Sequence, residues 1–259
     1  MSKIIEFIGS LVLATLRDLG RFTLFSIEVI KWLFYPPFKI RDLIGHMSEI
    51  GVNSLVVVSL TAFATGSVLA LQTYQGFARF GAESMVGAVV GLSMVRELGP
   101  MLTAIMVAAR AGSAMAAELG SMKVTEQIDA LYTLSANPIK YLIVPRFIAT
   151  TVTLPFLVVL ANVIGIGGGA LVSVHVLGAN PVTYFERTFT YLTLNDIYSG
   201  LIKSVVFGMT IALISCYQGF DTEGGAEGVG LATTRAVVMS SISIFIFDYI
   251  LTAILFDNL

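Results

Sequence analysis

Charged residues are scarce in this sequence. Asp, Glu, Lys and Arg together make up 12% of the chain, whereas an ordinary soluble domain contains about 25%. Hydrophobic residues account for 56%, and the mean hydropathy is +0.87. This deficit of charge excludes a soluble domain and predicts an integral membrane protein, for which we expect no nucleic-acid partner.

The sequence also lacks the residue sets typical of disulfide frameworks, metal sites, nucleotide hydrolysis and nucleophilic catalysis. Cys216 is the single cysteine, which excludes a disulfide framework and a cysteine-based metal site. His46 and His175 are isolated and suggest no metal site. The phosphate-binding pattern GxxxxGK[ST] is absent, so we expect no nucleotide hydrolysis by that route. No Ser/His/Asp set is apparent, and we expect neither catalysis nor a bound cofactor on this chain.

Long apolar runs are abundant, and they predict an all-α membrane protein whose residues 1–259 form a single domain. A helix needs about 20 apolar residues to cross a bilayer. Five transmembrane helices are expected, at residues 50–75, 98–118, 142–178, 201–220 and 236–256.

Three stretches around these spans are less regular. Residues 85–95 are apolar but run into Arg96-Glu97, and we expect a half-inserted or re-entrant segment there. Residues 179–200 are amphipathic and aromatic, which favours a short interfacial element. The third span contains a glycine run at 165–169, where we expect packing with an irregularity, and its length also allows it to fold back.

Residues 1–37 predict an amphipathic helix that lies in the membrane interface. At 100° per residue, most charged side chains of this segment fall within an arc of roughly 80°, opposite an apolar face. They are Lys3, Glu6, Arg17, Arg21, Glu28 and Lys31. This pattern is typical of a helix that does not cross the bilayer. Trp32 and Tyr35 suit the headgroup level, and Pro36-Pro37 end the helix.

A polar passage, Glu118–Leu131, separates two strongly apolar segments. Thr125 can cap a helix whose first turn contains Glu126, where the helix dipole favours an anion. We expect this short helix at residues 125–135, ending before Asn137-Pro138. A short helix between two spans buries little by itself, so we expect it to bind in a groove of another protein. An ordinary connecting loop is the alternative.

Basic residues are distributed unevenly between the two sides of the predicted spans. One side has Lys3, Arg17, Arg21, Lys31, Lys39, Arg41, Lys123, Lys140, Arg146 and Arg235. The other side has Arg79, Arg96, Arg187 and Lys203. The positive-inside rule therefore predicts that the N-terminus and the polar passage are cytoplasmic and that the C-terminus is outside.

Four charged residues share a similar predicted depth in the outer half of the spans. They are Arg96, Glu97, Lys203 and Asp248. A charge at the centre of a span costs about 2.5–3.5 kcal/mol on the insertion scale, so such residues are candidates for a functional site. We expect them to line a cavity and to contact a zwitterionic or anionic headgroup. A set of structural ion pairs is the alternative.

Small residues recur every four positions in the second span, at Ala104, Ala108, Gly112 and Ala116. Such a row lets two membrane helices approach closely. It favours self-association of two copies, with packing inside one subunit as the alternative. Arg110 lies near mid-span in the same helix, and we expect it to bond to backbone carbonyls or to a partner side chain such as Asn162.

The segment ARAGSAMAAELGSMKVTEQIDAL, with RELGP before it and NPIKYLIVPR after it, resembles the MlaE/YrbE family of ABC-transporter permeases. The resemblance extends over essentially the whole chain. It implies a homodimer of five-span subunits in the inner membrane of Gram-negative bacteria, each with an N-terminal interfacial helix. The implied substrate is phospholipid, moved between the inner and outer membranes to maintain lipid asymmetry.

The resemblance also implies further partners. The short cytoplasmic helix corresponds to a coupling helix that docks on a separate ATPase, and that ATPase binds ATP and Mg²⁺. A STAS-domain protein binds the ATPase, and a periplasmic MCE-domain ring sits above the dimer. The coupling residues expected are Glu118, Lys123, Thr125, Glu126, Ile128, Asp129 and Leu131.

Acyl-chain contacts are expected from side chains at the outer end of the first span, which equally suit simple packing. They are Leu69, Tyr74, Phe77 and Phe80. Two other functions stay open from the residues alone: an ion-coupled secondary transporter, and a membrane scaffold for a periplasmic ring. A secondary transporter favours inverted repeats and ionisable groups near the midplane, and no convincing repeat is visible.

Overall fold

The computed structural model describes residues 2–35 and 40–256, and all elements in these ranges are helices. Five helical segments there are long and apolar enough to cross a membrane. They are Ile40–Ala78, Glu83–Val124, Ile139–His175, Leu194–Phe220 and Gly225–Leu255. The predicted all-α membrane fold is confirmed, and each segment begins earlier in the chain than predicted.

The first and third spans pack backbone against backbone. The first consists of α2 (Ile40–Gly51), η1 (Val52–Ser54) and α3 (Leu55–Ala78), and the third of η5 (Ile139–Ile143) and α8 (Val144–His175). A Cβ atom on Gly66 would lie 1.9 Å from the carbonyl oxygen of Gly165, so this approach requires glycine. Since α8 is continuous through the glycine run, the predicted irregularity is wrong and the alternative of a fold-back is excluded. Gly165, Gly168 and Gly169 serve packing, whereas Gly167 faces open space.

The second span is one long helix with two wider turns. Its parts are η2 (Glu83–Met85), α4 (Val86–Ser93), the π-helical η3 (Met94–Leu98), α5 (Gly99–Val107), the π-helical η4 (Ala108–Gly112) and α6 (Ser113–Val124). The predicted re-entrant segment is wrong, because the helix continues across Arg96-Glu97 as a π-helical turn. Pro100 follows this wider turn closely, inside the continuous helix, where it supplies no backbone N–H donor.

The last two spans, α10 (Leu194–Phe220) and α11 (Gly225–Phe256), pack against α6. The row Ala104, Ala108, Gly112 and Ala116 is buried within the chain. A Cβ atom on Gly112 would lie 2.8 Å from Ser215 Oγ of α10, and one on Gly219 of α10 would lie 2.8 Å from the Ala116 carbonyl oxygen. This row therefore packs inside one subunit, and the expectation that it meets a second copy is wrong.

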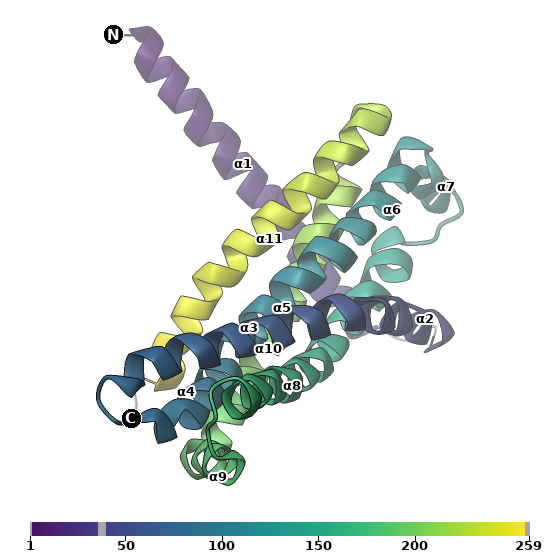
Figure 1. The fold of residues 1–259 in the computed structure, drawn as a ribbon. Coiled ribbons are helices and arrows are strands. Elements are labelled where there is room, and N and C mark those ends of the chain that lie inside the picture. The colour runs from purple at the N-terminus through teal and green to yellow at the C-terminus, as the bar shows by residue number, and fades with distance from the viewer. Residues whose placement is uncertain (1, 36–39, 257–259) are drawn as a thin grey trace.

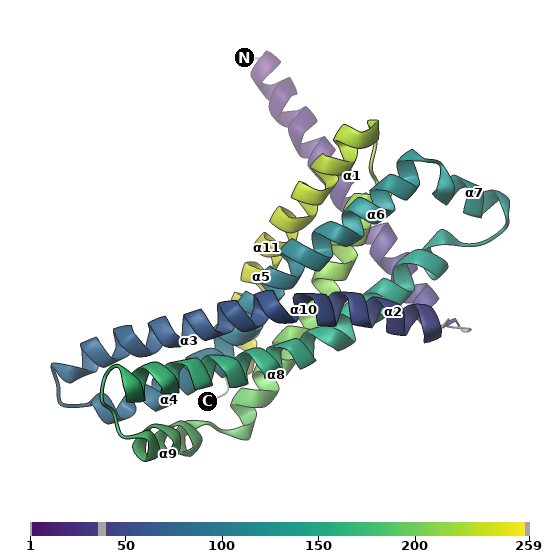
Figure 2. The same cartoon turned by 45° about the vertical axis from the view of Figure 1, so that its right-hand side comes forward.

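The two ends of the bundle carry different short helices. Figures 1 and 2 show α7 (Gln127–Thr133) at one end and α9 (Pro181–Tyr191) at the opposite end. The C-terminal part of α11 reaches the same end as α9. We refer to the two ends of the bundle as the α7 end and the α9 end.

Helix α1 (Ser2–Leu33) joins the bundle only through its second half, and its N-terminal half projects away from the other helices (Figure 1). Phe25 and Val29 are buried, and the Phe22 and Phe25 rings lie 5.3 and 5.5 Å from the ring of Tyr217 in α10. Pro36-Pro37, predicted to end this helix, lies outside the described residues. Its location in the membrane interface stays a prediction.

Candidate functional site

Three spans contribute charged side chains to one cluster in the half of the bundle near α9. Lys203 Nζ donates to Glu97 Oε2 at 2.5 Å and to Thr252 Oγ1 at 2.8 Å. It also donates to the carbonyl oxygen of Arg96 at 3.1 Å. Asp248 Oδ1 lies 3.1 Å from the same ammonium nitrogen, without hydrogen-bonding geometry. We call Glu97, Lys203, Asp248 and Thr252 the Lys203 cluster.

Helical spacing explains how α11 reaches this cluster. Its inward row consists of residues spaced by four, namely Ala232, Ala236, Ser240, Ile244, Asp248 and Thr252. Small side chains at the start of the row allow close packing on α6 and α10. The same row then presents Asp248 and Thr252 to Lys203 of α10.

Arg96 forms a second ion pair beside the cluster. Its Nε atom donates to Asp196 Oδ1 at 2.6 Å, and the Asp196 side chain is 1% exposed. Asp196 Oδ2 also accepts from the Thr193 N–H group at 2.8 Å, which caps the start of α10. The sequence reasoning missed Asp196 because it placed residues 179–200 in an interfacial element, although the Thr193 to Asp196 spacing is a capping signal.

The exposed fractions of these side chains decide which of them a ligand can touch. Arg96 and Glu97 are 36% and 34% exposed, whereas Asp248 is 15% and Lys203 0% exposed. The expectation that Lys203 contacts a substrate is therefore corrected for this conformation: Lys203 positions the two carboxylates instead. The accessible groups are a guanidinium and a carboxylate on adjacent residues.

A second set of charges lies in the half of the bundle near α7. Arg146 Nη2 pairs with Glu118 Oε1 at 2.9 Å, and Arg146 Nη1 donates to the carbonyl oxygen of Leu142 at 2.6 Å. Arg110 Nη1 donates to the carbonyl oxygen of Glu49 at 2.9 Å and to Ser54 Oγ at 3.1 Å. We call Arg110, Arg146 and Glu118 the arginine network.

The expected backbone bond of Arg110 is present, but Asn162 is not its partner. A Cβ atom on Gly99 would lie 1.8 Å from Asn162 Oδ1, so the Asn162 amide fills the space beside Gly99, next to η3. Glu118, expected to contact an ATPase, is bonded to Arg146 of its own chain, with its side chain 49% exposed.

The α7 segment differs in detail from its prediction. Thr125 ends α6, and its Oγ1 donates back to the Ser121 carbonyl oxygen at 2.8 Å, so it does not cap α7. Glu126 precedes α7 with a φ angle of 58°. Ile128 is 0% exposed and cannot contact a partner protein in this conformation. Lys123 pairs with the exposed Asp129 at 3.1 Å, and Leu131 is half-buried.

The residues expected to contact acyl chains do not share one environment. Leu69, Tyr74 and Phe77 pack partly against the core, whereas Phe80 is 84% exposed in the turn after α3. Leu69, Tyr74 and Phe77 therefore agree with the alternative of simple packing, and Phe80 does not.

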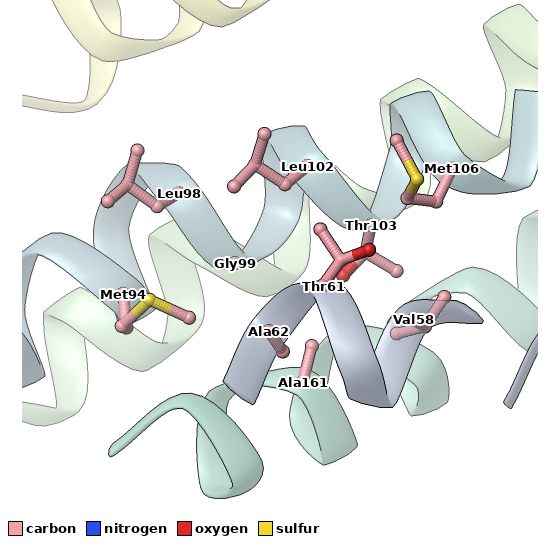
Figure 3. A pocket seen from close by; sticks show the side chains of 10 residues that line it. All are labelled: Val58, Thr61, Ala62, Met94, Leu98, Gly99, Leu102, Thr103, Met106 and Ala161. Atoms are coloured by element: carbon pink, nitrogen blue, oxygen red, sulfur yellow. The ribbon is translucent and has the colours of Figure 1, made fainter. Parts of the chain in front are cut away.

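A small cavity lies where α3, the second span and α8 meet (Figure 3). Its volume is about 10 Å³, enough for one water molecule. Thr61 and Thr103 lie at its centre, and Met94 and Leu98 line one end. A single chain thus provides no room for an acyl chain at this seam.

The model of the Permease MlaE family matches residues 43–254. The chain belongs to the MlaE permease family. A probable ABC transporter permease protein of Rickettsia typhi is 49% identical over 254 residues, which cover 98% of each chain. The intermembrane phospholipid transport system permease protein MlaE of Haemophilus influenzae is 39% identical over 255 residues, or 97% of each chain.

A chloroplast relative is also similar: the protein TRIGALACTOSYLDIACYLGLYCEROL 1 of Arabidopsis thaliana is 44% identical over 218 residues, covering 84% of this chain and 62% of its own. This MlaE-family chain is thus a multi-pass membrane permease of the ABC transporter class. A permease of that class works with a separate ATPase subunit.

The MlaE-family permease places a charged side chain in each of its three described π-helical turns. Arg96 and Glu97 lie in η3, Arg110 in η4 and Lys140 in η5. A π-helical turn inserts one extra residue and rotates the side chains that follow it, and such turns are frequent at functional sites. No sequence signal predicted these turns, because a single inserted residue leaves the apolar pattern nearly unchanged.

Proposed function

We propose that this permease moves phospholipid, driven by ATP hydrolysis on a separate ATPase. The main support is that Arg96 and Glu97 are both accessible, while their partners Asp196 and Lys203 are buried inside an apolar bundle. A guanidinium and a carboxylate side by side suit a headgroup that contains a phosphate and an ammonium group. The apolar helices around them suit acyl chains. The name of the Haemophilus influenzae relative supports the same substrate class.

The proposed assembly is a homodimer in the inner membrane of a Gram-negative bacterium. The seam in Figure 3 holds about one water molecule, so an acyl chain has no room there, and we place the lipid chamber between two copies. The α7 end faces the cytoplasm and the α9 end the periplasm, which agrees with the distribution of basic residues. A periplasmic MCE-domain ring above the α9 end receives or delivers the lipid, and the transport maintains outer-membrane asymmetry.

In this proposal the ATPase docks on α7 and binds ATP and Mg²⁺, and a STAS-domain protein binds the ATPase. Glu126 and Asp129 are exposed at that end. We expect Glu126→Lys and Asp129→Lys to abolish co-purification of the ATPase. Glu227→Lys is the matched control, because Glu227 is also an exposed acid near the α7 end. Retention of the ATPase by both α7 variants would remove α7 as its docking site.

The transport itself is tested by reconstituting the permease, the ATPase and the MCE-domain protein with fluorescent phospholipid. We expect lipid to move between the liposome and the MCE-domain protein only with hydrolysable ATP. Movement that follows an ion gradient without ATP would indicate a secondary transporter. No movement under either condition, with the complex assembled, would indicate a scaffold.

A further inference from the structure

A separate cavity of about 340 Å³ lies at the α9 end. Its lining comes from the end of α3, the start of the second span and the turn that joins α8 to α9. The lining residues used below are Tyr74, Glu83, Ser84, Asn180, Thr183 and Tyr184. The volume lies in the range of small-molecule sites, about 300–1,000 Å³. The Lys203 cluster contributes nothing to this lining, so the cavity is distinct from the site above.

Close packing of α9 on α4 forms one wall of the cavity. A Cβ atom on Gly87 would lie 2.3 Å from the Tyr184 carbonyl oxygen, and one on Gly91 would lie 2.8 Å from Thr188 Cγ2. Gly178, with a φ angle of +71°, turns the chain from α8 toward α9. These contacts fix α9 beside α4 and leave the space toward Tyr74 of α3 open.

The lining combines an acid, an aromatic ring and neutral polar groups. Glu83 supplies a carboxylate, and it takes part in none of the ion pairs found among the described residues. Tyr74 supplies an aromatic ring, and an acid beside an aromatic ring suits an ammonium group. Ser84 and Thr183 supply hydroxyl donors. Asn180 uses its Oδ1 atom to accept from the Val182 N–H group at 2.9 Å, which leaves its amide nitrogen as a donor.

We propose that this cavity binds the phosphoethanolamine headgroup of a membrane lipid, with the ammonium group at Glu83 and Tyr74 and the phosphate at Ser84, Asn180 and Thr183. The inference rests on the proposed function, namely that the permease transports phospholipid. It adds a headgroup preference and a second lipid site, at the α9 end of the bundle. A free phosphoethanolamine compound has the same chemistry, so the test compares the two sources.

The test is a lipid titration of the purified full-length permease by native mass spectrometry. Dioleoyl phosphatidylethanolamine, dioleoyl phosphatidylglycerol and soluble glycerophosphoethanolamine are the three probes. All preparations carry Glu97→Gln, because the proposed headgroup contact at the Lys203 cluster would otherwise compete for the same lipids. We expect phosphatidylethanolamine to bind about tenfold more tightly than phosphatidylglycerol, and the soluble headgroup at least a hundredfold more weakly than the lipid.

Two substitutions separate the role of the acid from that of the hydroxyl donors. Glu83→Gln should reduce the tenfold preference to less than twofold, while Thr183→Val should weaken both lipids about threefold and keep the preference. Glu186→Gln is the matched control, an exposed acid on α9 outside the lining, and should change neither. Thermal unfolding of each variant shows whether the fold is retained.

An unchanged preference in folded Glu83→Gln would overturn the proposal. Soluble glycerophosphoethanolamine binding as tightly as the lipid would overturn its assignment to a membrane lipid. Neither result affects ATP-driven transport, which is measured separately with the native Glu97, so failure here is distinguishable from failure of the proposed function.

Discussion

Charged side chains join the helices of this bundle in two places, and they do so differently. In the Lys203 cluster a fully buried ammonium group bonds to a carboxylate, a hydroxyl group and one backbone carbonyl oxygen of the second and fifth spans. In the arginine network Arg146 pairs across helices with Glu118, a carboxylate that is half exposed, and Arg110 bonds across helices to the Glu49 carbonyl oxygen and to Ser54. Water can replace a partner of a half-exposed carboxylate, but it cannot reach a fully enclosed ammonium group. The Lys203 cluster is therefore expected to contribute more to stability than the arginine network.

Removal of Lys203 gives the largest expected loss of stability. Lys203→Met leaves Glu97 and Asp248 close together without their shared cation, and a broken buried pair costs about 3–5 kcal/mol. We expect the midpoint of SDS-induced unfolding to fall strongly. A second variant, Lys203→Met with Asp248→Asn, removes one of the two remaining charges and should recover part of the loss. Equal stability of wild type and Lys203→Met would contradict the central role of this ammonium group.

Charge reversal at Glu97 tests the ligand-facing side of the same cluster. Because Glu97 is 34% exposed, Glu97→Lys can turn toward the open side, and we expect the complex to assemble. The variant places a cation where the headgroup's ammonium group would lie, so transport should fall to the background rate. The measurement is ATP-driven lipid transfer, with size-exclusion chromatography to verify assembly. A near-normal rate of lipid transfer would mean that the Lys203 cluster serves only as structural ion pairs and does not contact the headgroup.

The charged residues within the spans were only partly predictable from the sequence. The depth of charged residues along apolar runs indicated Arg96, Glu97, Lys203 and Asp248, and three of these meet in one cluster. Depth alone does not indicate which side chains are enclosed, since that depends on neighbouring spans. Lys203 is therefore buried although it was expected at a substrate surface.

The small-residue row of the second span illustrates the same limit. A four-residue spacing predicts close helix packing, and the packing is present. The identity of the partner, α10 of the same chain, depends on tertiary arrangement that no local pattern specifies. The π-helical turns have an even weaker signal, because each adds one residue to a helix whose faces are all apolar.

Removal of Arg146 should cost less than removal of Lys203. Arg146→Met deprives Glu118 of its partner, but Glu118 is 49% exposed and can bond to water. The Leu142 carbonyl oxygen loses only a side-chain donor four residues along its own helical segment, so the expected loss is about 1–3 kcal/mol. SDS-induced unfolding is again the measurement, and Glu118→Gln is the milder control. A loss as large as that of Lys203→Met would show that the two networks are equivalent.

The smallest expected effect is the coupling between Arg110 and Ser54, which the 3.1 Å hydrogen bond predicts. Arg110→Met also removes the bond to the Glu49 carbonyl oxygen, so the single variant measures both bonds together. A double-mutant cycle with Ser54→Ala isolates the shared bond, for which we expect a coupling of about 0.5–1 kcal/mol. The matched cycle, Lys203→Met with Thr252→Val, should give a larger value because Lys203 is fully enclosed. Equal coupling energies in the two cycles would contradict the expectation that enclosing the cation strengthens its hydrogen bonds.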